Sequence, residues 1–400
     1  MTRFNVDRLA RKMDAAGVAG LVAATAENIA YLTGIVSVPL RMFPHTGQSF
    51  AVVARDAPGS PVFVSSACEV DQALDADVPL RDVLAHGTFY RELGPASTLT
   101  ARDRELAQFT VDAPRYATPT GALLAALRTA GLAGERIAVD DDGVLPAVAA
   151  GIREAPGGPA ATVPAGALLR DVRKVKTAAE LDRVAAAAAL AEAGIRAVAG
   201  VAAPGLTEIE MVRTFERAVV AGGGRPEFTL IKIGAGAVAG QTAPTLTKLE
   251  RGDAIWFDVG CTLAGYWSDI ARVYSLGEPA PRLAELYAGA LAGADAAVAT
   301  ARPGMTGGEL FNLVVETVRE NGIPHYRRHH VGHGIGTEVY DRVLLTPDNT
   351  DGLETGTVVN VETPYYEFGL GAVHVEDPFV VCPGGNRLLT ELDRGLQVID

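Results

Sequence analysis

Four acidic residues stand in otherwise apolar runs in the second half of the chain. Asp258 lies in GDAIWFDVG and Glu362 in GTVVNVETP, each six residues after a glycine. A further acid follows each of them, Asp269 in WSDIARV and Glu376 in HVEDPFVV. If these runs are strands, side-chain alternation puts Asp258 and Glu362 on the same strand faces as apolar neighbours. We therefore expect the acids to be buried and to have a chemical function.

A cluster of four buried carboxylates needs protons, basic side chains or cations to balance its charge. One like-charge pair about 4 Å apart costs roughly 4 kcal/mol at an effective dielectric constant of 20. Two divalent ions would balance the four charges, and one imidazole would complete an oxygen-rich site. His333, between glycines in HHVGHGIGTEVYD, is the natural imidazole, because glycine lets the backbone approach closely. The alternative is pairing with arginines, for which the candidates are Arg170, Arg173 and Arg272.

An internal repeat would bring these acids together. Segments from residues 204 and 303, PGLTEIEMVRTFERAVVAGG and PGMTGGELFNLVVETVRENG, share Pro-Gly and a Thr-x-x-Glu capping box before an amphipathic helix. The boxes are Thr207 with Glu210 and Thr306 with Glu309. Each segment precedes a predicted strand pair that holds two of the acids. Two such units would meet across a pseudo-twofold axis, and chance similarity of two capped helices is the alternative.

The first part of the chain has a different pattern. Residues 6–170 alternate helical segments such as NVDRLARKMDAAG with short apolar runs such as FAVVA, which predicts a mixed α/β domain. A Gly- and Pro-rich stretch at 153–166 interrupts this pattern, and Thr177 with Glu180 then predicts a new capped helix. We expect an α/β (α+β) fold with two domains, 1–170 and 171–400.

Composition limits the partners. The formal charge of −13 and the pI near 5.1 leave no basic surplus to bind nucleic acid or an anionic membrane, so a small-molecule ligand is expected. Three cysteines far apart in the sequence, Cys68, Cys261 and Cys382, predict free thiols rather than disulfides. The charged N-terminal segment lacks a signal-peptide pattern, and we expect a cytoplasmic protein.

The ligand pattern resembles one known family. Asp258-x10-Asp269, GHGIG around His333 and the pair Glu362 and Glu376 are similar to the motifs of the pita-bread metallohydrolases of peptidase family M24: prolidase, aminopeptidase P, methionine aminopeptidase and creatinase. ENIAYLTG and LRDVRKVKTAAEL resemble the N-terminal domain of the prolidase and creatinase branch and its link to the second domain. The resemblance implies a creatinase-like N-terminal α/β domain followed by a pita-bread domain with pseudo-twofold internal duplication.

The resemblance also implies a dinuclear centre. Asp258 and Glu362 would bind one ion each, Asp269 and Glu376 would bridge the two ions, and His333 would bind one of them. The two divalent ions are expected to be manganese first, with cobalt, zinc or iron as alternatives.

Three positions depart from the family pattern. Gln241 and Tyr340 stand where the peptidases carry histidines, and His374, two residues before Glu376, stands where they usually carry an arginine. His329 matches a family histidine. Gln241 and Tyr340 could still donate hydrogen bonds to an oxyanion, and His374 could transfer protons or orient Glu376. Tyr340 could also be only a packed loop aromatic.

These features predict a metal-dependent hydrolase that cleaves an amide or other C–N bond of a small molecule or dipeptide. Ordinary Xaa-Pro peptidase activity, creatinase-like or lyase chemistry and a non-catalytic metal-binding paralogue are the alternatives. The candidate catalytic residues are Glu362, His329, His374, Tyr340 and Gln241. His325 and His330 are given no role.

A homodimer is also expected. The resemblance implies that the N-terminal domain of one chain helps to cover the site of the other. PLRMFPHTGQSF, residues 39–50, carries Arg41, Phe43 and His45 without an evident role inside a small α/β domain. A structural loop is equally consistent with this segment.

Overall fold

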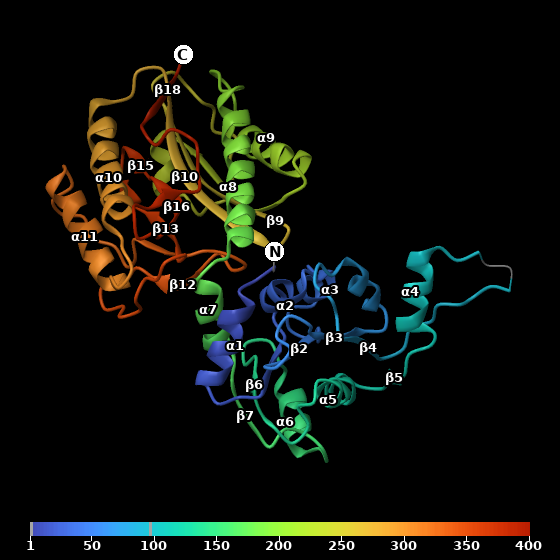
Figure 1. The fold of residues 1–400 in the computed structure, drawn as a ribbon. Coiled ribbons are helices and arrows are strands. Elements are labelled where there is room, and N and C mark those ends of the chain that lie inside the picture. The colour runs from blue at the N-terminus through green and yellow to red at the C-terminus, as the bar shows by residue number, and fades with distance from the viewer. Residues whose placement is uncertain (1–2, 96–97) are drawn as a thin grey trace. The chain divides into compact units, whose positions relative to one another are not determined.

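The computed structural model describes residues 3–95 and 98–400 (Figure 1). The chain divides into two compact units, Met1–Arg173 and Lys174–Asp400, and each unit has its own large sheet. Helix α7 (Gly166–Lys174) contains this division, and the boundary predicted after residue 170 falls within the same helix. No helix in the described part of the chain combines the length and apolar character needed to cross a membrane.

The first unit is built on a seven-stranded sheet in the order β5-β4-β3-β2-β1-β6-β7. Strand β2 pairs antiparallel with β1 and β3, and the other pairs are parallel. The strands are β1 (Gly20–Ala23), β2 (Phe50–Ala54), β3 (Val62–Ser66), β4 (Asp82–His86), β5 (Arg115–Tyr116), β6 (Arg136–Val139) and β7 (Ala161–Pro164). The other helices are α1 (Val6–Ala15), α2 (Ala26–Thr33), α3 (Val38–Met42), η1 (Val70–Asp75), α4 (Ala101–Thr110), α5 (Pro119–Thr129) and α6 (Pro146–Glu154).

Both faces of this sheet are buried. Successive residues of β1 enter different cores, Leu21 with α1 and α2 and Val22 with α5 and α6, as strand alternation requires. The predicted mixed α/β domain is therefore present. In the 39–50 segment, Arg41, Phe43 and His45 are exposed on and after α3, so these side chains have no role in either core.

The second unit is built on a nine-stranded sheet whose main order is β12-β11-β13-β16-β10-β9-β8; β17 pairs with β16 and β18 with β10. Its strands are β8 (Arg225–Ile233), β9 (Ala254–Leu263), β10 (Tyr266–Leu276), β11 (Gly332–Gly334), β12 (Asp341–Leu344), β13 (Val358–Glu362), β16 (Glu376–Val380), β17 (Arg387–Leu388) and β18 (Gln397–Ile399), with a separate hairpin of β14 (Tyr365–Glu367) and β15 (Gly371–Val373). Its helices are α8 (Ala178–Ala199), α9 (Glu208–Ala221), η2 (Gly234–Ala239), α10 (Pro281–Thr300) and α11 (Gly307–Glu320).

The internal repeat is visible in the backbone. All three predicted capping boxes form, at the starts of α8, α9 and α11. Thr207 forms an isolated bridge with Lys248, and Thr306 forms the equivalent bridge with Gly352, each pairing the helix cap with a residue shortly before a strand that carries one of the acids. The sheet order is likewise matched about its centre, with β8-β9-β10 on one side and β11-β13-β16 on the other.

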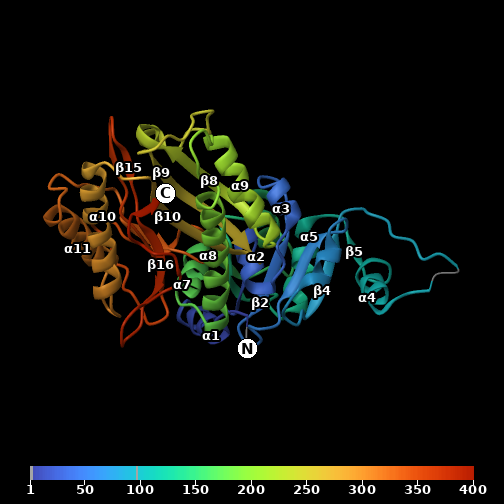
Figure 2. The same cartoon turned by 90° about the horizontal axis from the view of Figure 1, so that it is seen from above.

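Two pairs of helices cover the sheet. Helices α8 and α9 pack with β8, β9 and β10, whereas α10 and α11 pack with β13 and β16, and both views show these groupings (Figure 1 and Figure 2). The cores contain mainly Ala, Val, Leu and Phe from the helices and the facing strand positions. The acids of β9, β10, β13 and β16 are thus carried by strands whose positions are fixed by helix packing.

Candidate metal centre

Backbone pairing places the predicted acids in one row across the sheet. Ala271 of β10 pairs with Asp258 of β9 on one side and with Glu376 of β16 on the other. Glu376 in turn lies directly opposite Glu362 of β13. Directly paired residues of antiparallel strands project from the same face, so all three acids lie on one face.

Asp269 and His333 join the same face by alternation. Asp269 is two residues before Ala271, and His333 of β11 pairs with Asn360, two residues before Glu362. A side-chain period of two therefore directs both toward the row of acids. The internal repeat thus achieves what its spacing predicts, since each half contributes two acids.

Two groups of side chains are close enough together to hold an ion. Asp269, His333 and Glu376 form one group, and Glu362, His374 and Glu376 form the other, with the potential ligand atoms of each group within 4.8 Å of one another. All five residues are buried, and Glu376 belongs to both groups. Asp258, the fifth predicted ligand, belongs to neither group and is partly exposed at the end of the row.

The imidazole of His333 is oriented for metal binding. Its Nδ1 lies 3.0 Å from the Gly334 carbonyl oxygen, so Nδ1–H donates there and Nε2 is directed at the acids. Nε2 lies 3.6 Å from Asp269 Oδ2 and 3.7 Å from Glu376 Oε1. A histidine held by one nitrogen with the other facing carboxylates is the usual arrangement of a metal ligand.

Unpartnered buried atoms also fit a cation. Asp269 Oδ1, His333 Nε2 and both ring nitrogens of His374 are buried without a hydrogen-bond partner among the described residues. Buried polar atoms without partners are rare, since each costs about 1–3 kcal/mol. Oxygen and imidazole nitrogen atoms that converge in this way fit one or two divalent ions.

Family comparison agrees with this geometry. Residues 182–383 match the model of metallopeptidase family M24, and residues 5–175 match the model of the creatinase/prolidase N-terminal domain. The chain belongs to metallopeptidase family M24. The family resemblance and the predicted order of a creatinase-like and a pita-bread domain are therefore confirmed.

Individual M24 relatives are similar at a moderate level. The chain is 29% identical to an Xaa-Pro dipeptidase from Pyrococcus furiosus over 57% of its own length, and the match spans 66% of that protein. An uncharacterized peptidase from Bacillus subtilis is 30% identical over 59% of this chain and 68% of its own. The fold matches an Xaa-Pro dipeptidase from Bacillus anthracis, with a TM-score of 0.76 and 23% identity over 98% of each chain.

Burial and mutual repulsion affect the acids of this M24 site. Burial raises the pKa of Asp269, and the charge of Glu362 adds to the effect against the opposing influence of His333. Burial and the charges of Asp269, Glu362 and Asp258 raise the pKa of Glu376 well above its usual value. Burial likewise raises the pKa of Asp258. The acid cluster without cations therefore retains protons that metal ions would displace.

Glu362 has partners that the sequence prediction missed. His330 Nε2 lies 2.7 Å from Glu362 Oε1, and Arg328 Nη2 lies 3.9 Å from Glu362 Oε2. Burial would raise the pKa of Glu362, but the hydrogen bond from His330 and the nearby imidazoles outweigh it and lower the pKa to about 2. Both missed residues lie in an irregular loop. Side chains do not alternate regularly there as they do in a strand, so the sequence does not show which way they point. His329, the predicted catalytic residue, is exposed and contacts His330, with 3.2 Å between the two Nδ1 atoms.

Asn360 is a third residue without a predicted role. Its Nδ2 donates to Glu376 Oε1 over 2.7 Å, which fixes the carboxylate shared by both groups. Strand alternation could have identified this residue, because Asn360 lies two positions before Glu362 on the same face.

Tyr340 lies at the mouth of the site. Its ring stacks on His333 with 3.9 Å between centroids and 17° between planes, and its hydroxyl lies 3.1 Å from His330 Nε2. The side chain is 49% exposed, so it covers the buried imidazole and also faces solvent. Gln241 is exposed in the turn after η2 and forms no hydrogen bond with the described part of the chain. The structure therefore brings Tyr340, but not Gln241, into contact with the cluster residues.

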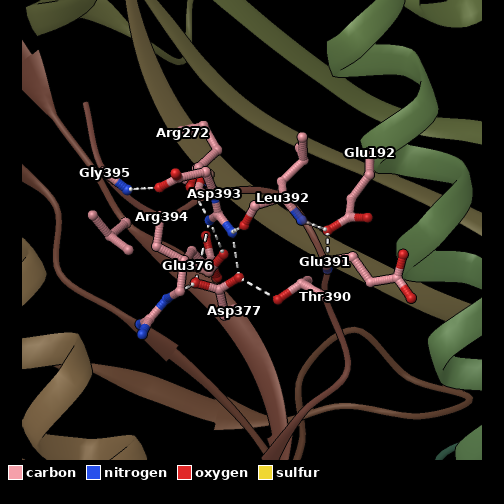
Figure 3. A network of polar contacts seen from close by, with 12 residues as sticks. Glu192, Arg272, Glu376, Asp377, Thr390, Glu391, Leu392, Asp393, Arg394 and Gly395 are labelled. Carbon is pink, nitrogen blue, oxygen red and sulfur yellow. Dashed lines mark hydrogen bonds and ion pairs between the residues drawn. The ribbon is translucent and has the colours of Figure 1, made fainter. Parts of the chain in front are cut away.

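A buried ionic network lies on the face of β10 and β16 opposite the acid cluster (Figure 3). Arg272 of β10 donates to both carboxylate oxygens of Asp377 in β16, over 2.5 and 3.2 Å, and to the Glu376 carbonyl oxygen over 3.0 Å. Arg394 Nε and Thr390 Oγ1 also donate to Asp377, over 2.8 and 2.6 Å. This network ties together the strands that carry Asp269 and Glu376.

The arginine alternative for the acid cluster is wrong for Arg272. Its guanidinium pairs with Asp377, on the opposite face of β16 from Glu376. Arg170 and Arg173 have partners within the first unit, Asp142 and Asn28 respectively. Alternation explains the outcome for Arg272, because it follows Asp269 by an odd number of residues and so projects from the other face.

Proposed function

We propose that this M24 chain is a dinuclear, divalent-metal-dependent hydrolase that cleaves an amide or other C–N bond of a small molecule or dipeptide. One observation carries the proposal: two buried groups of carboxylate and imidazole ligands share Glu376. A shared carboxylate is how two ions are held a few ångströms apart in dinuclear hydrolases.

Five residues would hold the ions. Asp258 and Glu362 would bind one ion each, Asp269 and Glu376 would bridge the two ions, and His333 would bind one of them. Bound divalent ions would polarise a substrate carbonyl and make water a better nucleophile at neutral pH. Manganese is the first expectation because the set is rich in oxygen, with cobalt, zinc or iron as alternatives.

Other residues would bind and orient the substrate. A cavity of about 260 Å³ is lined by His325, Arg327, Arg328, Pro364, Tyr365 and Tyr366. Arg328, which lines this cavity, also lies 3.9 Å from Glu362, so the cavity lies beside the acid cluster and presents positive charge suited to a substrate carboxylate or carbonyl. The Tyr340 hydroxyl and His330 are placed to donate hydrogen bonds to an oxyanion formed beside Glu362. His329, His374 and Gln241 stay candidate catalytic residues.

Ordinary Xaa-Pro dipeptidase activity is the second candidate. The name of the Pyrococcus furiosus relative favours it. Tyr340 and Gln241 weigh against it, because they replace the two histidines expected of the peptidases. We therefore place a changed substrate first.

Metal analysis and a substrate panel test the proposal. Chelator-treated protein is reloaded with manganese, cobalt or zinc, and metal per chain is measured with turnover of Xaa-Pro dipeptides, other dipeptides, N-acyl amides and cyclic amides. We expect two ions per chain and metal-dependent cleavage of a substrate outside the Xaa-Pro class. Cleavage of Xaa-Pro dipeptides at about 10 per second would establish the second candidate. Absence of bound metal after reloading would overturn both.

The homodimer and the cytoplasmic location stay predictions of the sequence. Light scattering tests the first. A monomeric mass with full activity would exclude a site completed by a second chain.

A further inference from the structure

His374 occupies a position in the centre that the expected ligand set leaves unused. It lies between β15 and β16, 2% exposed, and its ring stacks on Trp256 with 6.0 Å between centroids and 19° between planes. Nε2 lies 3.4 Å from Glu376 Oε2 and 3.8 Å from Glu362 Oε2. The ring is thus packed in place with one nitrogen directed at two carboxylates.

This arrangement matches that of His333 in the other group. Each imidazole places Nε2 between Glu376 and one further carboxylate, Asp269 for His333 and Glu362 for His374. The two histidines approach different oxygens of Glu376, Oε1 and Oε2 respectively. The centre therefore has one carboxylate and one imidazole on each side of a shared carboxylate.

The distances favour coordination over hydrogen bonding. A histidine that only orients a carboxylate would donate a hydrogen bond to it, yet neither ring nitrogen of His374 has a hydrogen-bond partner in the described residues. Ligands at about 2.1 Å from one ion are separated by roughly 3.0–3.4 Å when the angle between them is 90–110°. The His374 distances lie near this range, so a small shift on ion binding would complete the contact.

We propose that His374 is a metal ligand, binding through Nε2 the ion that Glu362 and Glu376 hold. The inference rests on the proposed dinuclear centre and adds a second imidazole to the single one expected of it. Each ion then has one nitrogen ligand, His333 for one and His374 for the other.

A second imidazole changes the metal preference. Carboxylates suit manganese, whereas imidazole favours zinc, cobalt and iron. We expect this chain to prefer zinc over manganese more strongly than a centre with one histidine. Replacing His374 with glutamine should reduce that preference and weaken the binding of one ion by about 10- to 100-fold or more, whereas the ion at His333 stays.

X-ray absorption spectroscopy of the zinc-loaded full chain tests the ligand directly. With two zinc ions per chain, we expect an average of one imidazole per zinc in the wild type. His374→Gln should lower this average to one imidazole per two zinc ions when both sites are filled. His86→Gln is the matched control, because His86 lies in the first unit, where its ring contacts the Gln48 carbonyl oxygen, and should leave the average unchanged.

The wild-type spectrum alone decides the case if the variant does not fold. Two bound zinc ions with an average of one imidazole per two zinc ions in the wild type would overturn the assignment of His374. The proposed dinuclear hydrolase would be unaffected by that result. Failure to bind two ions would instead refute the dinuclear centre itself. Unchanged imidazole content in a folded His374→Gln protein would also overturn the inference.

Discussion

Glu376 and Asp377 are consecutive residues of β16, both are buried, and they have opposite surroundings. Asp377 accepts hydrogen bonds from Arg272, Arg394 and Thr390, so the protein itself satisfies its charge. Glu376 faces other acids, and Asn360 is the neutral donor that holds it. One strand therefore has a stabilising ionic network on one face and a repulsive cluster on the other.

The different surroundings of Glu376 and Asp377 distinguish a buried charge that stabilises the fold from a buried charge that serves function. A carboxylate with cationic partners in the protein needs nothing further, and losing a partner leaves an uncompensated buried charge. A carboxylate among other carboxylates needs external cations, and losing it relieves repulsion. Removing the carboxylate at one or the other of these adjacent positions should thus change stability in opposite directions.

The largest expected effect is at Asp377. Asp377→Ala should lower the free energy of unfolding of the metal-free protein by about 3–5 kcal/mol, because the buried Arg272 loses its partner. Urea denaturation measures the change. Asp295→Ala is the control, since Asp295 pairs with Arg394 at an exposed position and should contribute less than about 1 kcal/mol. Equal effects of the two substitutions would contradict the structural role of the network.

The next effect has the opposite sign. Glu376→Gln should raise the free energy of unfolding of the metal-free protein by about 1–2 kcal/mol, because glutamine is neutral without taking up a proton on folding and keeps an oxygen for Asn360. The same variant should bind less metal and lose metal-dependent activity. A less stable metal-free variant would show that Glu376 is structural, as Asp377 is.

The pH dependence of stability should separate the two states of the centre. The pKa of Asp269 and of Glu376 is raised by burial, so the folded metal-free protein holds protons that the unfolded chain releases above about pH 4. Its stability should fall as the pH rises above about 5, by up to about 1.4 kcal/mol per pH unit for a group that is protonated in the folded protein and ionised in the unfolded chain. Glu362, with a pKa of about 2, is ionised in both states over this range and adds no slope.

Saturating metal should reverse that trend, since ions bind the deprotonated ligands more tightly at higher pH. Thermal unfolding with and without manganese measures both curves. Parallel curves would mean that the raised carboxylates do not bind the added metal.

The smallest expected effect compares two adjacent histidines. His330→Ala should lower kcat by about fivefold, because His330 contacts both Glu362 and the Tyr340 hydroxyl. His329→Ala should change kcat less than twofold, since His329 is exposed and contacts the site only through His330. A larger loss at His329 would instead support the catalytic role that its position in the sequence predicts.

These cases show what the sequence can predict. The capping box at Thr306 and the spacing from Gly356 to Glu362 are local signals, and the helices and the row of acids form as they indicate. Strand alternation extends this to Asn360, on the face of the acids, and to Arg272, on the opposite face. His330 and His329 lie in a loop in which side chains do not alternate regularly. Which of the two faces the acids therefore depends on the backbone conformation of the loop, for which the sequence has no local signal. The ligand role of Asp258 stays a prediction, since Asp258 lies beside the two groups of potential ligands and belongs to neither.

The network around Asp377 also has a consequence for the order in which the chain is made. Arg272 donates to the backbone carbonyl oxygen of Asp393, and β10 pairs with β18 through Tyr274 and Gln397. Glu192 in α8 accepts a hydrogen bond from the amide of Leu392. Leu392, Asp393 and Gln397 are all synthesised after the strands and helices that they contact. A ribosome-bound chain that lacks this segment holds a buried arginine without its full set of acceptors, so the catalytic unit should reach its final fold only after residue 399 has left the exit tunnel.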